Sequence, residues 1–201
     1  MTADVAPSTP QRIVIVGGTG SGKTTLATVL SGAVGLPAHH LDEIARHGGG
    51  TGVQRSPAER ATALAEILES SHWIAEGIHL GWTDDLLQAA DVIIWLDHVS
   101  WRSSSARMVK RFVRQALDEA RREKGLRRFA RFGDYARHLR DLLRAIPEAR
   151  GYHQTAGGGS QPAETRAATA ARMALHSDKL IHCRTAADVR ACVAGLSPRS
   201  R

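Results

Sequence analysis

The chain has 201 residues, of which 42% are hydrophobic and 23% are charged, a composition typical of one globular domain rather than a disordered or fibrous chain. No apolar run approaches the roughly 20 residues of a membrane span, and the start, MTADVAPSTPQ, lacks the basic and apolar regions of a secretory signal. We therefore expect a cytoplasmic protein with no membrane partner. The two cysteines, Cys183 and Cys192, form neither a disulfide framework nor a zinc pattern.

Positive charge is concentrated in one quarter of the chain. Residues 102–150 contain 15 basic and 6 acidic residues. The whole chain has a net charge of +7, so the remainder is slightly acidic. A segment of this kind either faces an anionic partner or forms a solvated surface.

Apolar and β-branched runs predict five strands, in chain order 12–16, 36–42, 72–76, 90–97 and 179–183. Helical spacing and capping residues predict helices at 24–34, 56–70, 83–89, 100–124, 134–146 and 185–194. The rest of 125–175 is expected to be irregular. Because strands alternate with helices, we predict an α/β fold in three layers, with a five-stranded parallel sheet covered by helices on both faces.

A glycine-rich segment joins the first predicted strand to the first predicted helix. Its sequence, GGTGSGKT, matches G-x-x-x-x-G-K-[ST]. Glycines let the backbone curl around an anion with its N–H groups pointing inward, and the helix N-terminus favours phosphate. Lys23 is expected to reach the β- and γ-phosphates and Thr24 to ligate Mg²⁺. We therefore predict an ATP and Mg²⁺ site formed by Gly17, Gly18, Thr19, Gly20, Ser21, Gly22, Lys23, Thr24 and Thr25.

Acidic residues end three of the predicted strands, at the edge of the sheet where α/β folds place function. Asp42 ends the second strand and Glu76 the third. A carboxylate there can hold Mg²⁺ or accept a proton from an attacking hydroxyl. We predict Asp42 as catalytic base or metal ligand and Glu76 as metal ligand, the alternative for each being a helix cap or surface carboxylate. Asp97 ends the fourth strand, where a cap is the favoured reading.

The predicted helix 100–124 carries a row of cations at helical spacing. Arg107, Lys110, Arg111 and Arg114 share one face. Phosphoryl transfer needs cations over the moving phosphoryl group. Arg107 and Arg111 are therefore predicted to be catalytic together with Lys23, the alternative being a solvated helix face.

Four segments carry a resemblance to a known family: RIVIVGGTGSGKTTLA at 12–27, LPAHHLDE at 36–43, HWIAEGIH at 72–79, and ADVIIWLD at 90–97 followed by SARMVKRF at 105–112. They resemble the P-loop kinases of the adenylate-kinase-like and nucleoside-kinase-like group, and look closest to small bacterial members known as adenylate kinases or "topology modulation" proteins. The resemblance covers roughly residues 12–114 together with the final predicted strand and helix, and it implies a P-loop NTPase fold. We predict one domain over 12–196, between a disordered tail at 1–11 and a second tail at 197–201. The resemblance also implies an acceptor-binding region at about 42–71 and a basic, helical lid insertion at about 115–172. In this family Arg107 would lie near the nucleotide base, and Arg111 would contact phosphates.

The chain departs from adenylate kinases in one segment. It has Glu76-Gly77-Ile78-His79 where they have Gly-Phe-Pro-Arg, which disfavours AMP as acceptor. The absence of Asn excludes the guanine-selecting N-K-x-D motif of GTPases.

We predict an ATP-dependent kinase that transfers the γ-phosphate to a nucleoside, nucleotide or similar small acceptor. One alternative is a nucleotide-dependent regulatory or nucleic-acid-binding protein. The basic segment favours that alternative, and the nine aromatic residues, which offer few stacking platforms, disfavour it. Another kind of ATPase is the remaining alternative. Nothing in the pattern selects an oligomeric state.

Overall fold

The computed structural model describes residues 10–48, 52–77, 79–122, 132–153 and 164–197. In this part of the chain, five parallel strands form one sheet in the order β2-β3-β1-β4-β5. Their bounds are β1 (Arg12–Gly17), β2 (Ala38–His40), β3 (Trp73–Glu76), β4 (Val92–Leu96) and β5 (Leu180–Cys183). β2 and β3 lie on one side of β1, and β4 and β5 lie on the other. The strand order therefore reverses at β1, and in open parallel sheets such a reversal opens a crevice at the carboxyl end of the strand.

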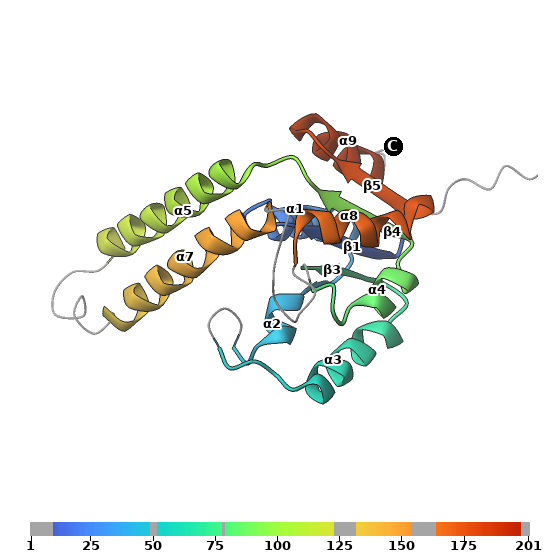
Figure 1. Cartoon of the computed structure of the whole chain (residues 1–201), viewed down its shortest axis with the longest axis horizontal. Helices are drawn as coiled ribbons and strands as arrows, with labels where there is room; N and C mark the ends of the chain where they lie inside the picture. The colour runs from blue at the N-terminus through green and yellow to red at the C-terminus, as the bar shows by residue number, and fades with distance from the viewer. Residues whose placement is uncertain (1–9, 49–51, 78, 123–131, 154–163, 198–201) are drawn as a thin grey trace, which may run out of the picture.

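Helices cover both faces of the sheet (Figure 1). Successive residues of a strand point to opposite faces, so Val14 and Val16 of β1 belong to one apolar core and Ile13 and Ile15 to the other. The first core is closed by α3 (Pro57–Glu69), α4 (Asp84–Ala89) and α8 (Arg166–Ala174), and the second by α1 (Lys23–Val34) and α9 (Ala186–Leu196). The predicted three-layer α/β fold is confirmed.

Local signals in the sequence explain where several helices begin. Ser56 accepts a hydrogen bond from the Glu59 N–H, and the Glu59 carboxylate accepts one from the Ser56 N–H, which completes the capping box before α3. Thr185 and Asp188 do the same before α9. Thr83 precedes α4, but its hydroxyl donates to the carbonyl of His79 instead of capping the helix.

The second strand is shorter than the sequence predicts. β2 ends at His40, and Asp42 lies in the first turn of the short helix α2 (Leu41–Ala45). Leu41 is 1% exposed and contacts Gly77, where an added Cβ would lie 2.7 Å from the Leu41 Cβ. The chain turns from β2 into α2 at the point where Leu41 becomes buried. The prediction that Asp42 ends a strand is therefore wrong, because Asp42 lies in α2.

A helix also replaces part of the segment expected to be irregular. Thr165 caps α8 by accepting from the Ala168 N–H. Thr169 and Met173, four residues apart, are both fully buried and face the sheet side of that helix. Residues 157–162, which belong to the segment expected to be irregular, lie outside the described residues.

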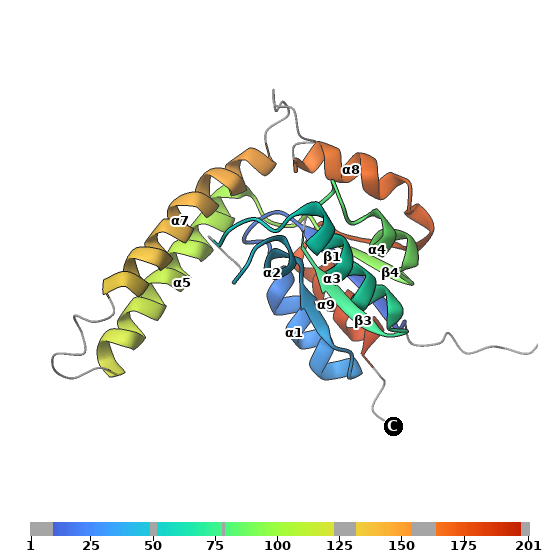
Figure 2. The same cartoon turned by 90° about the horizontal axis from the view of Figure 1, so that it is seen from below.

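Two long helices project away from the sheet as an antiparallel hairpin (Figures 1 and 2). They are α5 (Trp101–Arg122), which lies within the helix predicted at 100–124, and α7 (Phe132–Tyr152), which is longer than the helix predicted at 134–146. At the root of the hairpin, the ring of Tyr152 lies so close to Gly18 that a Cβ added there would be 2.6 Å from it. An added Cβ on Gly20 would be 3.0 Å from Ser104. In the described part of the chain, no helix combines the length and apolar character needed to cross a membrane.

Asp97, which follows β4, is held by Arg166 and His182. Its carboxylate accepts both hydrogen bonds of the Arg166 guanidinium, at 2.6 and 2.7 Å, and contacts His182 Nε2 at 3.0 Å. Burial would raise the pKa of Asp97, but the hydrogen bonds from Arg166 and His182 outweigh it and lower that pKa. Asp97 therefore ties β4 to β5 and α8 and is not the expected cap.

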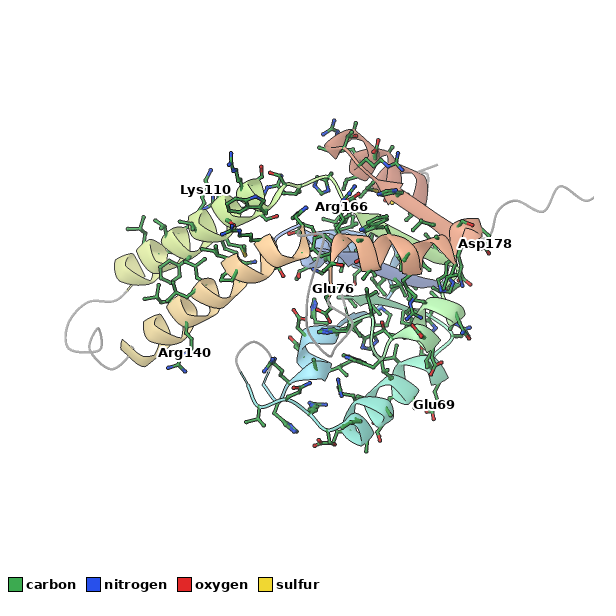
Figure 3. All side chains as sticks on the ribbon, viewed as in Figure 1. Glu69, Glu76, Lys110, Arg140, Arg166 and Asp178 are labelled. Atoms are coloured by element: carbon green, nitrogen blue, oxygen red, sulfur yellow. The ribbon has the colours of Figure 1, made fainter. Side chains whose placement is uncertain are left out.

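We expect Asp97→Asn to lower the free energy of unfolding by about 2 kcal/mol. Breaking a buried ion pair costs about 3–5 kcal/mol. The cost here is smaller because Arg166 is 53% exposed and can regain water. Urea unfolding measures the difference. The exposed Asp178→Asn (Figure 3) serves as control and should stay within about 0.5 kcal/mol of the wild type. Equal stability of the two variants would contradict a structural role for Asp97.

Candidate active site

The glycine-rich loop between β1 and α1 has the backbone that its sequence predicts. Gly20 and Gly22 adopt φ values of +76° and +100°, which residues with a side chain rarely adopt. The Ser21 N–H donates to the Gly18 carbonyl at 3.1 Å and closes the loop. The Ser21 hydroxyl is buried and has no hydrogen-bond partner among the described residues. The left-handed glycines turn the backbone of the loop into the N-terminus of α1, where N–H groups favour a phosphate.

Lys23 lies over this loop. Its ammonium group donates to the carbonyl of Gly18 at 3.3 Å. Burial lowers the pKa of Lys23, and the carboxylates of Glu76, Asp42 and Glu164 act in the opposite direction. The lysine is therefore a desolvated cation with three carboxylates around it. In such surroundings a cation acts strongly on a phosphate.

Glu76 lies beside the loop because of strand pairing. Its register partner on β1 is Ile15, and the N–H of Gly77 donates to the Ile15 carbonyl at 3.1 Å. Glu76 is 5% exposed. Its Oε1 accepts a hydrogen bond from the Thr24 hydroxyl at 2.8 Å and contacts His40 Nδ1 at 2.8 Å. The pairing of β3 with β1 thus brings together two of the three predicted metal ligands.

The donor set at Thr24 and Glu76 fits Mg²⁺. This ion prefers oxygen ligands, and it keeps several waters while binding one or two protein groups plus substrate phosphates. A hydroxyl and a carboxylate 2.8 Å apart, at the first turn of α1, match that pattern. Across the described residues, no three His, Cys, Asp or Glu side chains gather into a metal-holding group. The ion would therefore be held jointly by these two side chains and the nucleotide.

Asp42 takes part in a different contact. Its Oδ1 lies 2.9 Å from His79 Nε2, and the other ring nitrogen of His79 lies 3.3 Å from Glu164 Oε1. The hydrogen bond with His79 lowers the pKa of Asp42. Asp42 is therefore an ionised, oriented carboxylate near Lys23, and the structure pairs it with His79 rather than with Thr24 and Glu76.

His79 is not among the site residues predicted from the sequence. The signal was present in the segment Glu76-Gly77-Ile78-His79, which departs from the family pattern where this histidine occurs. His79 is mostly enclosed, with 17% of its side chain exposed. The His79 ring stacks on the Trp82 ring, with the two centroids 4.9 Å apart. The guanidinium of Arg60, which belongs to α3, lies 5.3 Å from the centroid of the Trp82 ring. These side chains form a wall beside Asp42.

We expect the stability of the protein to fall between about pH 6.5 and pH 9 because His79 loses its proton there. Burial would lower the pKa of His79, but its hydrogen bonds with Asp42 and Glu164 raise it from 6.5 to about 9. A raised pKa contributes stability that is complete below pH 6.5 and is lost as the pH passes 9. The shift corresponds to at most about 3 kcal/mol, and less here because Asp42 is 74% exposed.

The test compares the free energy of urea unfolding of the wild type and of His79→Asn at pH 6 and at pH 9.5. The variant should be less stable than the wild type at pH 6, and most of this difference should be gone at pH 9.5. A deficit of equal size at both pH values would contradict the charged state of His79.

The predicted catalytic arginines lie on the hairpin. Arg107 and Arg111 are exposed on α5. Arg107 is close enough to His98 to help lower the pKa of that histidine, for which burial is the larger cause. The structure does not bring either guanidinium into contact with the glycine-rich loop in the described residues. Figure 3 shows Lys110 and Arg140 on the hairpin, and Glu76 within the sheet domain.

Comparison with known proteins yields structural similarity only. No family model matches the sequence, and no curated protein matches it. A gluconokinase from Sinorhizobium meliloti 1021 is similar in structure, with a TM-score of 0.45, 18% identity, and coverage of 94% of this chain and 92% of that one. A shikimate kinase from Acinetobacter baumannii in complex with shikimate has a TM-score of 0.38, 19% identity, and coverage of 84% and 94%. A sugar kinase from Janibacter sp. HTCC2649 has a TM-score of 0.37, 18% identity, and coverage of 83% and 94%.

Proposed function

We propose that the protein is an ATP-dependent kinase that phosphorylates a small acceptor. The observation that supports this most is the convergence of Lys23, Thr24, Glu76 and Asp42 at the carboxyl ends of β1, β2 and β3. Lys23, Thr24 and Glu76 suit the nucleotide and its metal, and Asp42 suits an attacking hydroxyl.

In this proposal the glycine-rich loop and Lys23 bind the β- and γ-phosphates, and Thr24 and Glu76 provide the protein ligands for the metal. Mg²⁺ supplies neutralisation of the phosphate charge when it is bound with the nucleotide. Lys23 is positioned to stabilise the negative charge that spreads over the transferring phosphoryl group.

Asp42 is the proposed base. An acceptor hydroxyl would hydrogen-bond to its carboxylate. As the bond between the acceptor oxygen and the γ-phosphorus forms, the bond from that phosphorus to the β–γ bridging oxygen breaks, ADP leaves, and the hydroxyl proton passes to Asp42. The low pKa of Asp42 suits a loose transition state, in which orientation of the nucleophile matters more than early removal of the proton. His79 holds one carboxylate oxygen and leaves the other for the acceptor.

The acceptor would bind next to Asp42, between α2, α3 and the wall formed by His79 and Trp82. This region lies within the predicted acceptor-binding residues 42–71 together with the segment that follows β3. The hairpin would act as the lid, with Arg107 and Arg111 approaching the phosphates only when it moves toward the loop.

The test is ADP release from ATP and Mg²⁺ by the purified protein, alone and with a panel of nucleosides, nucleoside monophosphates, sugars and hydroxy acids. We expect a large stimulation by one acceptor class and loss of activity when EDTA removes the metal. ATP binding without stimulation by any acceptor would contradict the kinase. Strongly salt-dependent DNA binding in that case would favour the nucleic-acid-binding alternative.

A further inference from the structure

The hairpin of α5 and α7 exposes a stripe of apolar side chains that the proposed reaction does not use. On α5 the exposed residues are Val109, Val113 and Leu117, each four residues after the last, and 40–52% of each is exposed. On α7 they are Leu139 and Leu143, at 44% and 63%. Single exposed apolar residues are common on proteins, but a continuous row on a projecting element marks an interaction surface.

Helix geometry places both rows on one side of the hairpin. Met108 and Ala149 are buried and mark the inner sides of α5 and α7. At about 100° per residue, Val109, Val113 and Leu117 lie about 100°, 140° and 180° from Met108 around α5, and Leu139 and Leu143 lie about 80–120° from Ala149 around α7. Both rotations are counted toward the C-terminus of their own helix, and the two helices run antiparallel. Seen along the hairpin, equal rotations from the inner sides therefore lead to the same side of the pair. We call this side, with its two rows of apolar residues, the apolar flank.

The other side of the hairpin faces the glycine-rich loop. Ser104 and Tyr152, which contact that loop, lie about 40–60° from Met108 and Ala149 in the opposite sense. Arg107 lies further around in that same sense, at about 100°. If the hairpin moves toward the nucleotide, it brings its arginine side over the loop and leaves the apolar flank in water. The flank therefore does not serve to cover the chain's own site.

We propose that the apolar flank is a dimer interface that binds the same flank of a second copy of this chain. α5 has 22 residues and α7 has 21. A helix rises about 1.5 Å per residue and is about 10 Å wide, so the whole side of the hairpin that carries the flank measures about 33 by 20 Å. Two such sides that meet along their full length bury roughly 1,300 Å², within the range of stable interfaces, and the exposed apolar residues lie in the middle of that area. A two-fold axis across the flank would give an antiparallel four-helix bundle.

The distribution of charge supports a second copy as the occupant. The net positive charge of this segment would repel a like segment if the charged sides met. Arg107, Arg111 and Arg114 lie on the opposite side, so pairing through the apolar flank keeps them apart. Arg102 and Arg150, which do lie toward the apolar flank, are at its root, where both guanidinium groups face the Trp101 ring at 5.6 and 5.9 Å.

Sedimentation velocity over a wide concentration range tests the interface. Three proteins are compared: the wild type, the double variant Val113→Gln with Leu143→Gln, and Arg114→Gln on the opposite side. We expect a concentration-dependent dimer for the wild type and for Arg114→Gln. In the double variant we expect a dissociation constant at least about tenfold higher. Thermal unfolding and ATP binding show that each variant is folded.

Three outcomes would overturn the proposal. The first is a wild type that stays monomeric at every concentration. The second is a double variant that dimerises as tightly as the wild type, which would place the interface elsewhere. The third is a monomeric wild type that sediments with phosphatidylglycerol vesicles and loses this binding in the double variant, because the flank would then contact an anionic membrane. None of these results depends on the acceptor or on kinase activity, so the dimer and the proposed function can fail separately.

Discussion

Asp42→Asn is expected to lower kcat by about 10²–10⁴-fold, the usual contribution of a general base. The amide keeps the shape of the carboxylate but loses its charge and its ability to take the hydroxyl proton. Among the described residues, Asp42 has no hydrogen bond to the glycine-rich loop, and it contacts His79. The KM for ATP should therefore change by less than about threefold. Initial rates at saturating acceptor and varied ATP separate the two constants.

Glu43→Gln is the matched control for this variant. Glu43 is the next residue of α2, is exposed, and has the same carboxylate-to-amide change. We expect it to retain nearly full activity. If Asp42→Asn and Glu43→Gln have similar kcat values, Asp42 does not act on the acceptor hydroxyl. If Asp42→Asn chiefly raises the KM for ATP, Asp42 belongs with the metal ligands instead.

Lys23→Met is expected to lower kcat/KM for ATP by about 10²–10³-fold, the size of effect seen when one preorganised electrostatic group is removed. Methionine keeps the length and apolar stem of lysine. Only the ammonium group is lost, which lies over the loop at 3.3 Å from the Gly18 carbonyl. Because its charge is desolvated, water cannot replace it well. Initial rates at varied ATP measure the loss.

Lys110→Met on the hairpin (Figure 3) is the control for charge. It removes the same group from an exposed position on α5, and we expect less than a twofold change. ATP affinity from calorimetry should also fall for Lys23→Met. Activity of this variant above one third of the wild-type value would contradict the assignment of the loop as the phosphate site.

Most of the fold could be predicted because its signals are local. Buried strands are apolar on both sides, as in Ile13–Val16, so runs of β-branched residues identify them. The capping boxes at Ser56 and Thr185 involve residues three apart and are visible in sequence. The glycine-rich loop has a defined spacing, and the backbone angles of Gly20 and Gly22 follow from it. The predicted sheet and its helical layers therefore required no knowledge of long-range contacts.

Other features depend on contacts between distant segments. The turn after His40 accompanies burial of Leu41 against Gly77, which belongs to another strand connection. His79 pairs with Asp42 and Glu164, which are 37 and 85 residues away in the sequence. No pattern within either segment announces such a pair. The separation of the hairpin into an arginine side and an apolar flank appears only once the two helices are known to be antiparallel neighbours. The roles of the predicted site residues stay predictions until the variants are measured.

The contacts of Tyr152 with Gly18 and of Ser104 with Gly20 constrain how this protein can change during evolution or design. The glycine-rich loop has no spare volume at these contacts. Gly18 can gain a methyl group only if Tyr152 is reduced in size as well, so substitutions at these two positions should arise as a compensating pair. Gly20 cannot gain one without strain, because its φ is +76° and the Cβ and backbone of Ser104 lie 3.0–3.3 Å from the added atom. Among the described residues of α5 and α7, those away from the root make no such contact with these glycines, so we expect the helices to tolerate changes in length by whole turns without altering the loop.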